Sequence, residues 1–186
     1  KITKIISLHG TKLISSFEGG LILTNDKKKY NYFKFNRYYS DKALSKLRQN
    51  DQMSEVEAIV AQNSLEDFKS NISNRKKIYK YYIKEFKNNL NLKDFKKIQK
   101  LNKDRDIFYR FIISSRNSSL LKNKLKRSGV LVEKPITCWS KSIKNYPVSK
   151  YYFDNILSIP FHNLLKKKQI NKVVKAIYKL NNENFN

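Results

Sequence analysis

The sequence predicts an α/β fold, and three observations lead to this prediction. Segments 2–8, 108–115 and 130–134 are short and rich in β-branched and apolar residues, which is typical of buried strands. Other segments, such as 73–87, repeat apolar side chains at helical spacing. Between the second and third of these strands lies a predicted helix, and the order strand, helix, strand is typical of an α/β unit.

The N-terminal elements surround a glycine-containing turn. The strand 2–8 is followed by the turn "HGT", and a second strand is predicted at 21–24. Between them the segment "SSFEGG" has paired glycines that can adopt positive φ, so Lys12 is expected near a tight strand connection. Asn25 or Asp26 is positioned to cap a helix over "KKKYNYFKFNRYY", and a polar loop, "SDKALSKLRQND", follows.

The later elements are mainly helices. Ser54 and Glu57 have the spacing of a capping box at the start of one helix, and an amphipathic helix is predicted from residue 73 or 74 to residue 87. The segment "NSSLLKNKLKRSG" predicts a helix that ends at Gly129. The C-terminal part predicts a proline-bounded loop around Trp139 and Pro147, a short strand near "ILSIPFH" and a last helix over 167–180.

Composition excludes several classes of protein. With 186 residues and 40% apolar residues, the chain can build a core. A single cysteine and two histidines exclude an internal disulfide framework and a Cys/His zinc cluster, so no metal site is predicted. Cys138 has no histidine placed to activate it, and we interpret it as a packing residue. Neither a membrane span nor a signal peptide is recognisable, and the expected location is the cytoplasm.

The net charge of +25 raises the alternative of a basic nucleic-acid-binding module. The lysines are spread over the whole chain, however, and most fall where a solvated helix face would place them. The sequence contains neither a helix-turn-helix pattern nor an aromatic RNA-binding signature. We therefore expect no nucleic acid as partner, and a binding assay at increasing salt would test this.

The segment "SLHGTK", followed by "FEGGLILTND", resembles the lysine segment of the DegT/DnrJ/EryC1/StrS family of pyridoxal-phosphate-dependent sugar aminotransferases. The usual form in that family is Ser-Phe-His-x-Thr-Lys, then Gly-Glu-Gly-Gly before a hydrophobic strand. Three further segments resemble the family in the same order along the chain. They are "NDQMSEVEAIVAQNSLEDF", "NRKKIYKYYIKEF" and "FDNILSIPFHNLLKKKQINKVVKAI".

The resemblance implies the C-terminal part of the aspartate-aminotransferase-like (fold type I) fold. Residues 1–72 correspond to the end of the cofactor-binding large domain, and residues 73–186 to the small C-terminal α/β domain. In the family, the first half of the chain carries the aspartate for the pyridine nitrogen, the stacking aromatic residue and the phosphate-binding helix terminus. We therefore expect an incomplete chain, one part of a longer aminotransferase, that is inactive alone.

The resemblance also implies site residues. Lys12 matches the lysine that holds pyridoxal 5′-phosphate as a Schiff base, and Ser7 matches a serine that binds the cofactor phosphate. Ser7 can alternatively be a serine that simply ends a buried strand. His9 matches a histidine near the cofactor, although a histidine bonded to local backbone fits equally. Asn50 matches an asparagine that reaches the cofactor of the neighbouring subunit, which implies a homodimer with a shared site, while Gln52 replaces the expected basic residue.

The implied activity is transfer of an amino group, typically from glutamate, to a nucleotide-linked keto sugar in polysaccharide biosynthesis. Trp139 occupies a region where many members have a His-Tyr-Pro segment, so substrate contacts cannot be transferred. His162 is interpreted as structural. A non-transaminating or inactive relative is the alternative; because dehydratases of the family replace the lysine with histidine, Lys12 argues against that class.

Overall fold

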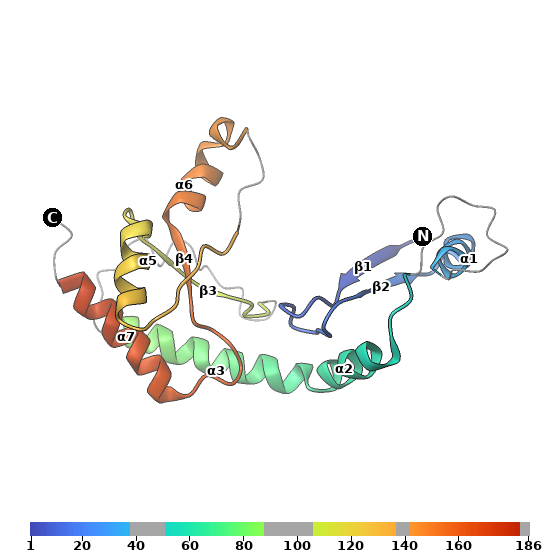
Figure 1. Ribbon diagram of the computed structural model, residues 1–186, viewed down its shortest axis with the longest axis horizontal. Coiled ribbons are helices and arrows are strands. Elements are labelled where there is room, and N and C mark those ends of the chain that lie inside the picture. Colours follow the sequence, from blue (N-terminus) through green and yellow to red (C-terminus); the bar gives the residue numbers. More distant parts are fainter. Residues whose placement is uncertain (38–50, 88–105, 137–141, 183–186) are drawn as a thin grey trace. The chain divides into compact units, whose positions relative to one another are not determined.

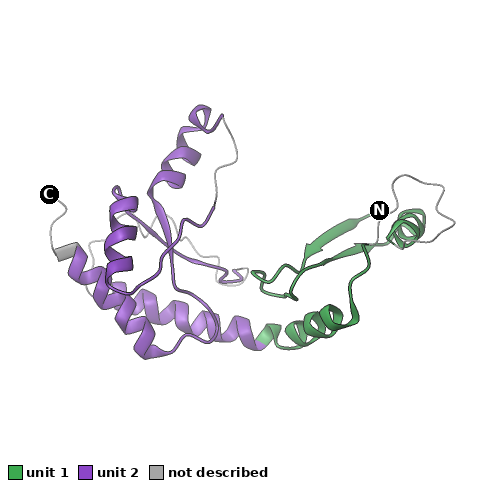
Figure 2. Cartoon of the chain, viewed as in Figure 1, with its two compact units in different colours: residues 1–69 green, residues 70–186 purple. Residues whose placement is uncertain are grey.

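The structure is a computed structural model that describes residues 1–37, 51–87, 106–136 and 142–182 (Figure 1). The chain divides into two compact units, Lys1–Lys69 and Ser70–Asn186 (Figure 2). The boundary expected from the sequence, between residues 72 and 73, lies a few residues later, within the helix that passes from one unit to the other.

Unit 1 begins with an antiparallel hairpin. Strand β1 (Thr3–Ser7) pairs with β2 (Gly20–Thr24), and the register places Ile5 opposite Ile22. The β-branched and apolar residues in both segments favour the extended backbone. Both strands predicted in this region are confirmed, with bounds that differ by at most one residue.

Helix α1 (Lys27–Asn36) begins where the sequence predicts a cap. The Asp26 carboxylate accepts a hydrogen bond from the Lys28 N–H at 3.0 Å and a longer one from the Lys29 N–H at 3.4 Å. These bonds satisfy amide donors that a helix start leaves without partners.

Helix α2 (Glu55–Glu66) begins at the predicted capping box. The Ser54 hydroxyl accepts from the Glu57 N–H at 3.2 Å, and the Glu57 carboxylate accepts from the Ser54 N–H at 3.0 Å. The Ser54 N–H, together with the Ser54 hydroxyl, lowers the pKa of Glu57 because both donate to its charged form.

Helix α3 (Phe68–Lys87) starts earlier than the sequence predicts. The expected start at residue 73 or 74 is wrong, because only one residue, Asp67, separates α2 from α3 and its backbone stays helical at φ −75° and ψ −8°. The chain therefore needs no new cap at Ser73.

Unit 2 contains a second two-stranded sheet. Strand β3 (Phe111–Ser114) pairs with β4 (Ile156–Ile159) in antiparallel register. The strand predicted over 130–134 is wrong, because this segment forms only an isolated bridge between Glu133 and Ser158. The helix predicted before it is confirmed as α5 (Ser118–Arg127).

The C-terminal region brings one more correction. Of the proline-bounded loop predicted around Trp139 and Pro147, the part at Trp139 lies outside the described residues, and the part at Pro147 is wrong: a 3₁₀ turn, Ile143–Asn145, leads into helix α6 (Pro147–Asn155). Pro147 occupies the first helical position, where the missing amide hydrogen costs nothing. The last helix is confirmed as α7 (Lys167–Asn182).

The hydrophobic core lies in unit 2. Rings from α3 and β3 form its centre, with centroids 4.8 Å apart for Tyr82 and Phe111 and 5.8 Å apart for Phe86 and Phe111. The Tyr82 hydroxyl donates to the Pro160 carbonyl at 2.9 Å, so this buried polar group has a partner. Burial raises the pKa of Tyr82 and raises the pKa of Tyr79 to about 12. Helices α5 and α7 cover this centre with buried aliphatic side chains: Leu121, Leu125, Ile170, Val173, Val174 and Ile177.

Arg75 joins three segments of unit 2. Its guanidinium donates to the carbonyls of Phe108 and Tyr109, both at 3.2 Å, and to that of Phe161 at 3.5 Å. It also lies over the Phe161 ring, 5.5 Å from the centroid. Burial lowers the pKa of Arg75. Arg75 therefore connects α3 by hydrogen bonds to the residues before β3 and to the segment after β4.

The described part of unit 1, in contrast, has almost no core. Among its described residues, Leu8 is the only buried apolar side chain. Ile5 on one face of the hairpin is 81% exposed, and Leu21 and Leu23 on the other face are 42% and 50% exposed. Apolar residues on both faces are typical of a strand pair that is covered on both sides.

None of the described helices combines the length and the apolar composition that crossing a membrane requires.

Candidate active site

The candidate site is the turn that follows the carboxyl end of β1. Backbone bonds extend the ladder beyond the strands: the Leu8 N–H donates to the Gly19 carbonyl at 2.9 Å, and the Gly10 N–H donates to the Phe17 carbonyl at 3.2 Å. The Ser16 N–H donates back to the Leu8 carbonyl at 2.7 Å. The connection is therefore a short, closed loop that contains Thr11 and Lys12.

Lys12 lies at the tip of this loop. Its backbone N–H donates to the His9 carbonyl at 2.8 Å, which fixes the turn at the lysine. Its side chain is exposed, and no hydrogen bond or ion pair engages its amine within the described part of the chain. A lysine with a fixed backbone and an available amine can act as a nucleophile or hold a carbonyl compound covalently.

Ser7 is the last residue of β1, and His9 lies in the turn that follows it. The Ser7 hydroxyl accepts from the His9 N–H at 3.4 Å and is otherwise exposed. The His9 Nδ1 lies 3.0 Å from the Thr11 hydroxyl and 3.2 Å from the Thr11 N–H. The structure thus brings Ser7, His9 and Lys12 close together at the end of β1. The His9 ring also bonds to the local backbone at Thr11, which is the alternative that the sequence left open for this residue.

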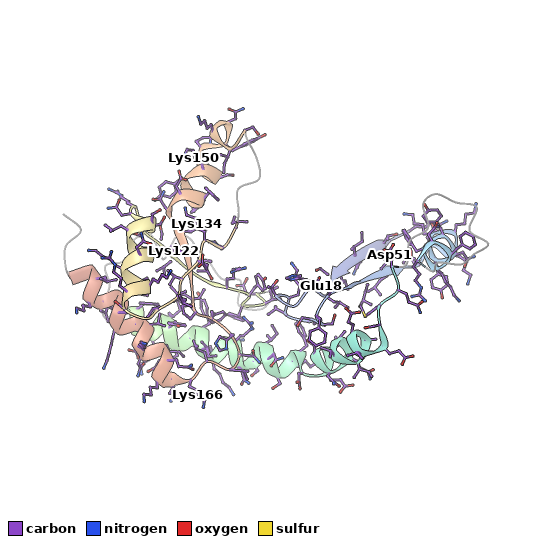
Figure 3. All side chains as sticks on the ribbon, viewed as in Figure 1. Glu18, Asp51, Lys122, Lys134, Lys150 and Lys166 are labelled. Atoms are coloured by element: carbon purple, nitrogen blue, oxygen red, sulfur yellow. The ribbon has the colours of Figure 1, made fainter. Side chains whose placement is uncertain are left out.

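Asn50 lies outside the described residues. The chain on either side of that segment is held close, because the Asp51 N–H donates to the Arg37 carbonyl at 3.1 Å. Two residues further, the Met53 side chain lies against Gly19 of the hairpin. Met53 therefore joins the segment that follows Asn50 to the hairpin that carries Lys12. Figure 3 labels Asp51 in this segment and Glu18 in the hairpin loop.

The other residues considered from the sequence contribute less. Gln52 is exposed, and Cys138 and Trp139 lie outside the described residues. His162 is exposed in unit 2, where its carbonyl accepts from the Leu165 N–H at 3.2 Å. No group of metal-ligating side chains that could hold an ion is found among the residues that the structure describes.

Sequence reasoning did not select Glu18 as a site residue. Its carboxylate lies 3.7 Å from the His9 Nε2, across the loop from the lysine turn. The available signal was its place in the "FEGG" segment, opposite "LHG" if the two strands form a hairpin.

Solved structures share this fold. A DegT DnrJ EryC1 StrS aminotransferase from Brucella abortus matches 96% of this chain and 50% of its own length, with a TM-score of 0.76 and 19% identity. PseC of Helicobacter pylori, an aminotransferase involved in pseudoaminic acid biosynthesis, matches 98% of this chain and 54% of its own length, with a TM-score of 0.78 and 18% identity.

The fold is therefore that of the C-terminal part of the fold type I pyridoxal-phosphate-dependent transferases, with the lysine turn at the end of a strand. More specifically, the chain belongs to the DegT/DnrJ/EryC1/StrS aminotransferase family, whose family model matches residues 2–178. The resemblance noted from four sequence segments is confirmed.

A curated relative comes from Campylobacter jejuni subsp. jejuni. It is named UDP-4-amino-4,6-dideoxy-N-acetyl-beta-L-altrosamine transaminase and is 30% identical over 105 residues, which cover 50% of this chain and 28% of the relative. A second protein of that name from another strain is 29% identical over 105 residues. The chain spans about half the length of the solved structures it matches, as their coverages of 50% and 54% state.

Proposed function

We propose that this chain is part of a pyridoxal-phosphate-dependent aminotransferase that transfers an amino group, from glutamate as donor, to a keto sugar linked to a nucleotide. The single observation that carries the proposal is Lys12: its backbone is fixed by the turn after β1, while its amine is available. Membership of an aminotransferase family supports the reaction class. The names of the Campylobacter jejuni relatives support a nucleotide-linked sugar as substrate.

The residues present fit the cofactor. The Lys12 amine would hold its aldehyde carbon, and the Ser7 hydroxyl would donate to its phosphate, because both extend from one turn at the carboxyl end of a strand. When bound, pyridoxal phosphate supplies an electron sink for a carbanion at the substrate carbon that bears nitrogen. The Lys12 amine would take the proton from that carbon and deliver it to the carbon that was the cofactor's aldehyde, which requires the amine to be unprotonated and partly shielded from water.

Two further parts of the proposal concern assembly. Asn50 would reach the cofactor of a second subunit, so that the active enzyme is a homodimer with a shared site, in the cytoplasm. The chain would act together with a polypeptide segment that supplies the aspartate for the pyridine nitrogen and the remaining strands of the sheet. The exposed apolar residues on both faces of β1 and β2 support this second part.

Reductive trapping tests the proposal. The protein, assembled with the aspartate-bearing segment, is incubated with a low concentration of pyridoxal phosphate, reduced with borohydride, digested and mapped by mass spectrometry. Of the 33 lysines, we expect Lys12 to carry the reduced cofactor. Lys12→Arg should abolish labelling and turnover, whereas the control Lys4→Arg, at an exposed lysine of β1, should leave both unchanged. Specific label on a different lysine would refute the assignment.

A further inference from the structure

His9 makes three contacts that define the lysine turn. Its carbonyl accepts from the Lys12 N–H at 2.8 Å, and its ring Nδ1 faces both the N–H and the hydroxyl of Thr11, at 3.2 Å and 3.0 Å. The ring of His9 therefore lies inside the turn that its own backbone begins. A change in the ring's orientation or tautomer would disturb the backbone that presents Lys12.

The hydrogen-bond partners of His9 select one tautomer. A backbone N–H can only donate, so the Nδ1 that faces the Thr11 N–H must be the acceptor and carries no proton. A neutral imidazole then carries its proton on Nε2. That nitrogen lies 3.7 Å from the Glu18 carboxylate, so a negative charge is placed at the protonated side of the ring.

Glu18 is fixed in this place by the opposite side of the loop. Its carbonyl accepts a hydrogen bond from the hydroxyl of Ser16, a buried residue. Its neighbours Phe17 and Gly19 accept the ladder bonds from Gly10 and Leu8. These backbone bonds set the hairpin register, and this register places the Glu18 carboxylate opposite His9. The Glu18 side chain itself is 71% exposed.

We propose that Glu18 is a positioning residue for the reaction proposed above. Glu18 acts through His9, because its carboxylate stabilises the tautomer of His9 that is protonated at Nε2. In this tautomer Nδ1 accepts the hydrogen bond from Thr11, and the turn holds Lys12 in place. The inference rests on the proposed function for its catalytic meaning, but the positioning itself concerns only this turn. The charge acts at short range in an exposed loop, so its effect is modest and falls with added salt.

Nitrogen-15 NMR of the full chain with labelled histidine tests the positioning. The sequence contains two histidines, and a His162→Gln variant assigns the signals of His9. At a pH where the ring is neutral, we expect the His9 Nδ1 in the unprotonated range and Nε2 in the protonated range. Glu18→Ala should shift the tautomer ratio toward Nδ1–H by about two- to fivefold, and Glu18→Gln should restore part of it by accepting a hydrogen bond without charge.

Amide hydrogen exchange supplies the second readout. Glu18→Ala should speed exchange at Thr11 and Lys12 by about the same two- to fivefold, while the ladder amide of Leu8 stays unchanged. The matched control is Glu55→Ala, an exposed glutamate of α2, which should change neither measurement. A dominant Nδ1–H tautomer in the unmodified protein, or identical results for Glu18→Ala and the unmodified protein, would overturn the proposal. Trapping of cofactor on a lysine other than Lys12 would instead refute the proposed function and leave the positioning result standing.

Discussion

The side chain of Met53 lies directly against Gly19: a β-carbon built on Gly19 would be 2.6 Å from the Met53 Cε. The φ of Gly19 is +114°, a backbone conformation that side-chain-bearing residues rarely adopt. Glycine is therefore required here for its backbone conformation, whereas the close contact is with the end of a flexible methionine side chain that can move aside. The contact joins the segment after Asn50 to the hairpin that carries Lys12.

Gly19→Ala should loosen the site. We expect the opening free energy of the hairpin to fall by roughly 1–3 kcal/mol, because alanine is strained at this φ. Hydrogen exchange at the Leu8 amide, which bonds to the Gly19 carbonyl, measures this directly. Adding Met53→Ala should recover little of this loss, because the end of the Met53 side chain can already move away from a β-carbon at position 19. Gly10→Ala is the control, since its β-carbon would meet nothing closer than 3.5 Å.

Unit 2 should lose stability at alkaline pH. Burial raises the pKa of Tyr79 from 10.0 to about 12, so folding favours the neutral phenol. The resulting stabilisation is fully present below pH 10 and is lost as the pH rises toward 12. Urea unfolding at a series of pH values measures the slope. Tyr79→Phe should reduce the slope without abolishing it, because burial also raises the pKa of Tyr82, and Tyr146→Phe, at an exposed tyrosine, should leave the slope unchanged; equal slopes for both variants would contradict the assignment.

Arg75→Lys should destabilise unit 2 despite keeping the charge. A lysine amine cannot reach the carbonyls of Phe108, Tyr109 and Phe161 with the same planar geometry. We expect the free energy of unfolding in urea to fall by about 1.5–3 kcal/mol. Lys76→Arg, at an exposed neighbour on α3, is the matched control and should change it by less than about 0.5 kcal/mol. An unchanged midpoint for Arg75→Lys would show that the carbonyl contacts contribute little.

The uncovered hairpin should cause self-association of the chain when it is studied alone. Ile5→Lys places a charge on the exposed face of β1 and should shift the sedimentation profile toward the monomer. The control is Val148→Lys in α6, because Val148 is also exposed, at 68%, but lies in the unit that has its own core. A similar effect of both substitutions would mean that general charge, and not the hairpin, governs association.

Local rules account for the parts of the fold that the sequence predicted well. Asp26 and Ser54 satisfy free amides of the helix that immediately follows them, so nothing distant is needed to recognise these caps. The start of α3 was missed because Ser73 looks like a cap even when the helix has already begun. Pro147 was taken as a loop residue although proline equally begins helices.

In the candidate site, too, residues that are close in sequence were predicted and contacts between distant residues were not. Lys12, Ser7 and His9 were predicted because they share one short segment with a recognisable order of residue types. The 3.7 Å approach of Glu18 to His9 depends on the register of the hairpin, which the spacing of residues along the chain does not specify. The prediction of a strand at 130–134 is wrong for a related reason: strand pairing depends on distant partners, and here it is limited to the bridge between Glu133 and Ser158 of β4.

The described residues of unit 1 bury almost no apolar side chain near the lysine turn, and this decides what a melting experiment can report. Heat or urea unfolds the packed aromatic centre around Tyr82, and the signal of that transition belongs to residues after 70. Substitutions in the turn of Lys12 can abolish chemistry without moving that transition at all. A screen that ranks variants by melting temperature would therefore not detect variants whose lysine turn is disrupted. Measurements at individual residues would distinguish such variants from the unmodified protein.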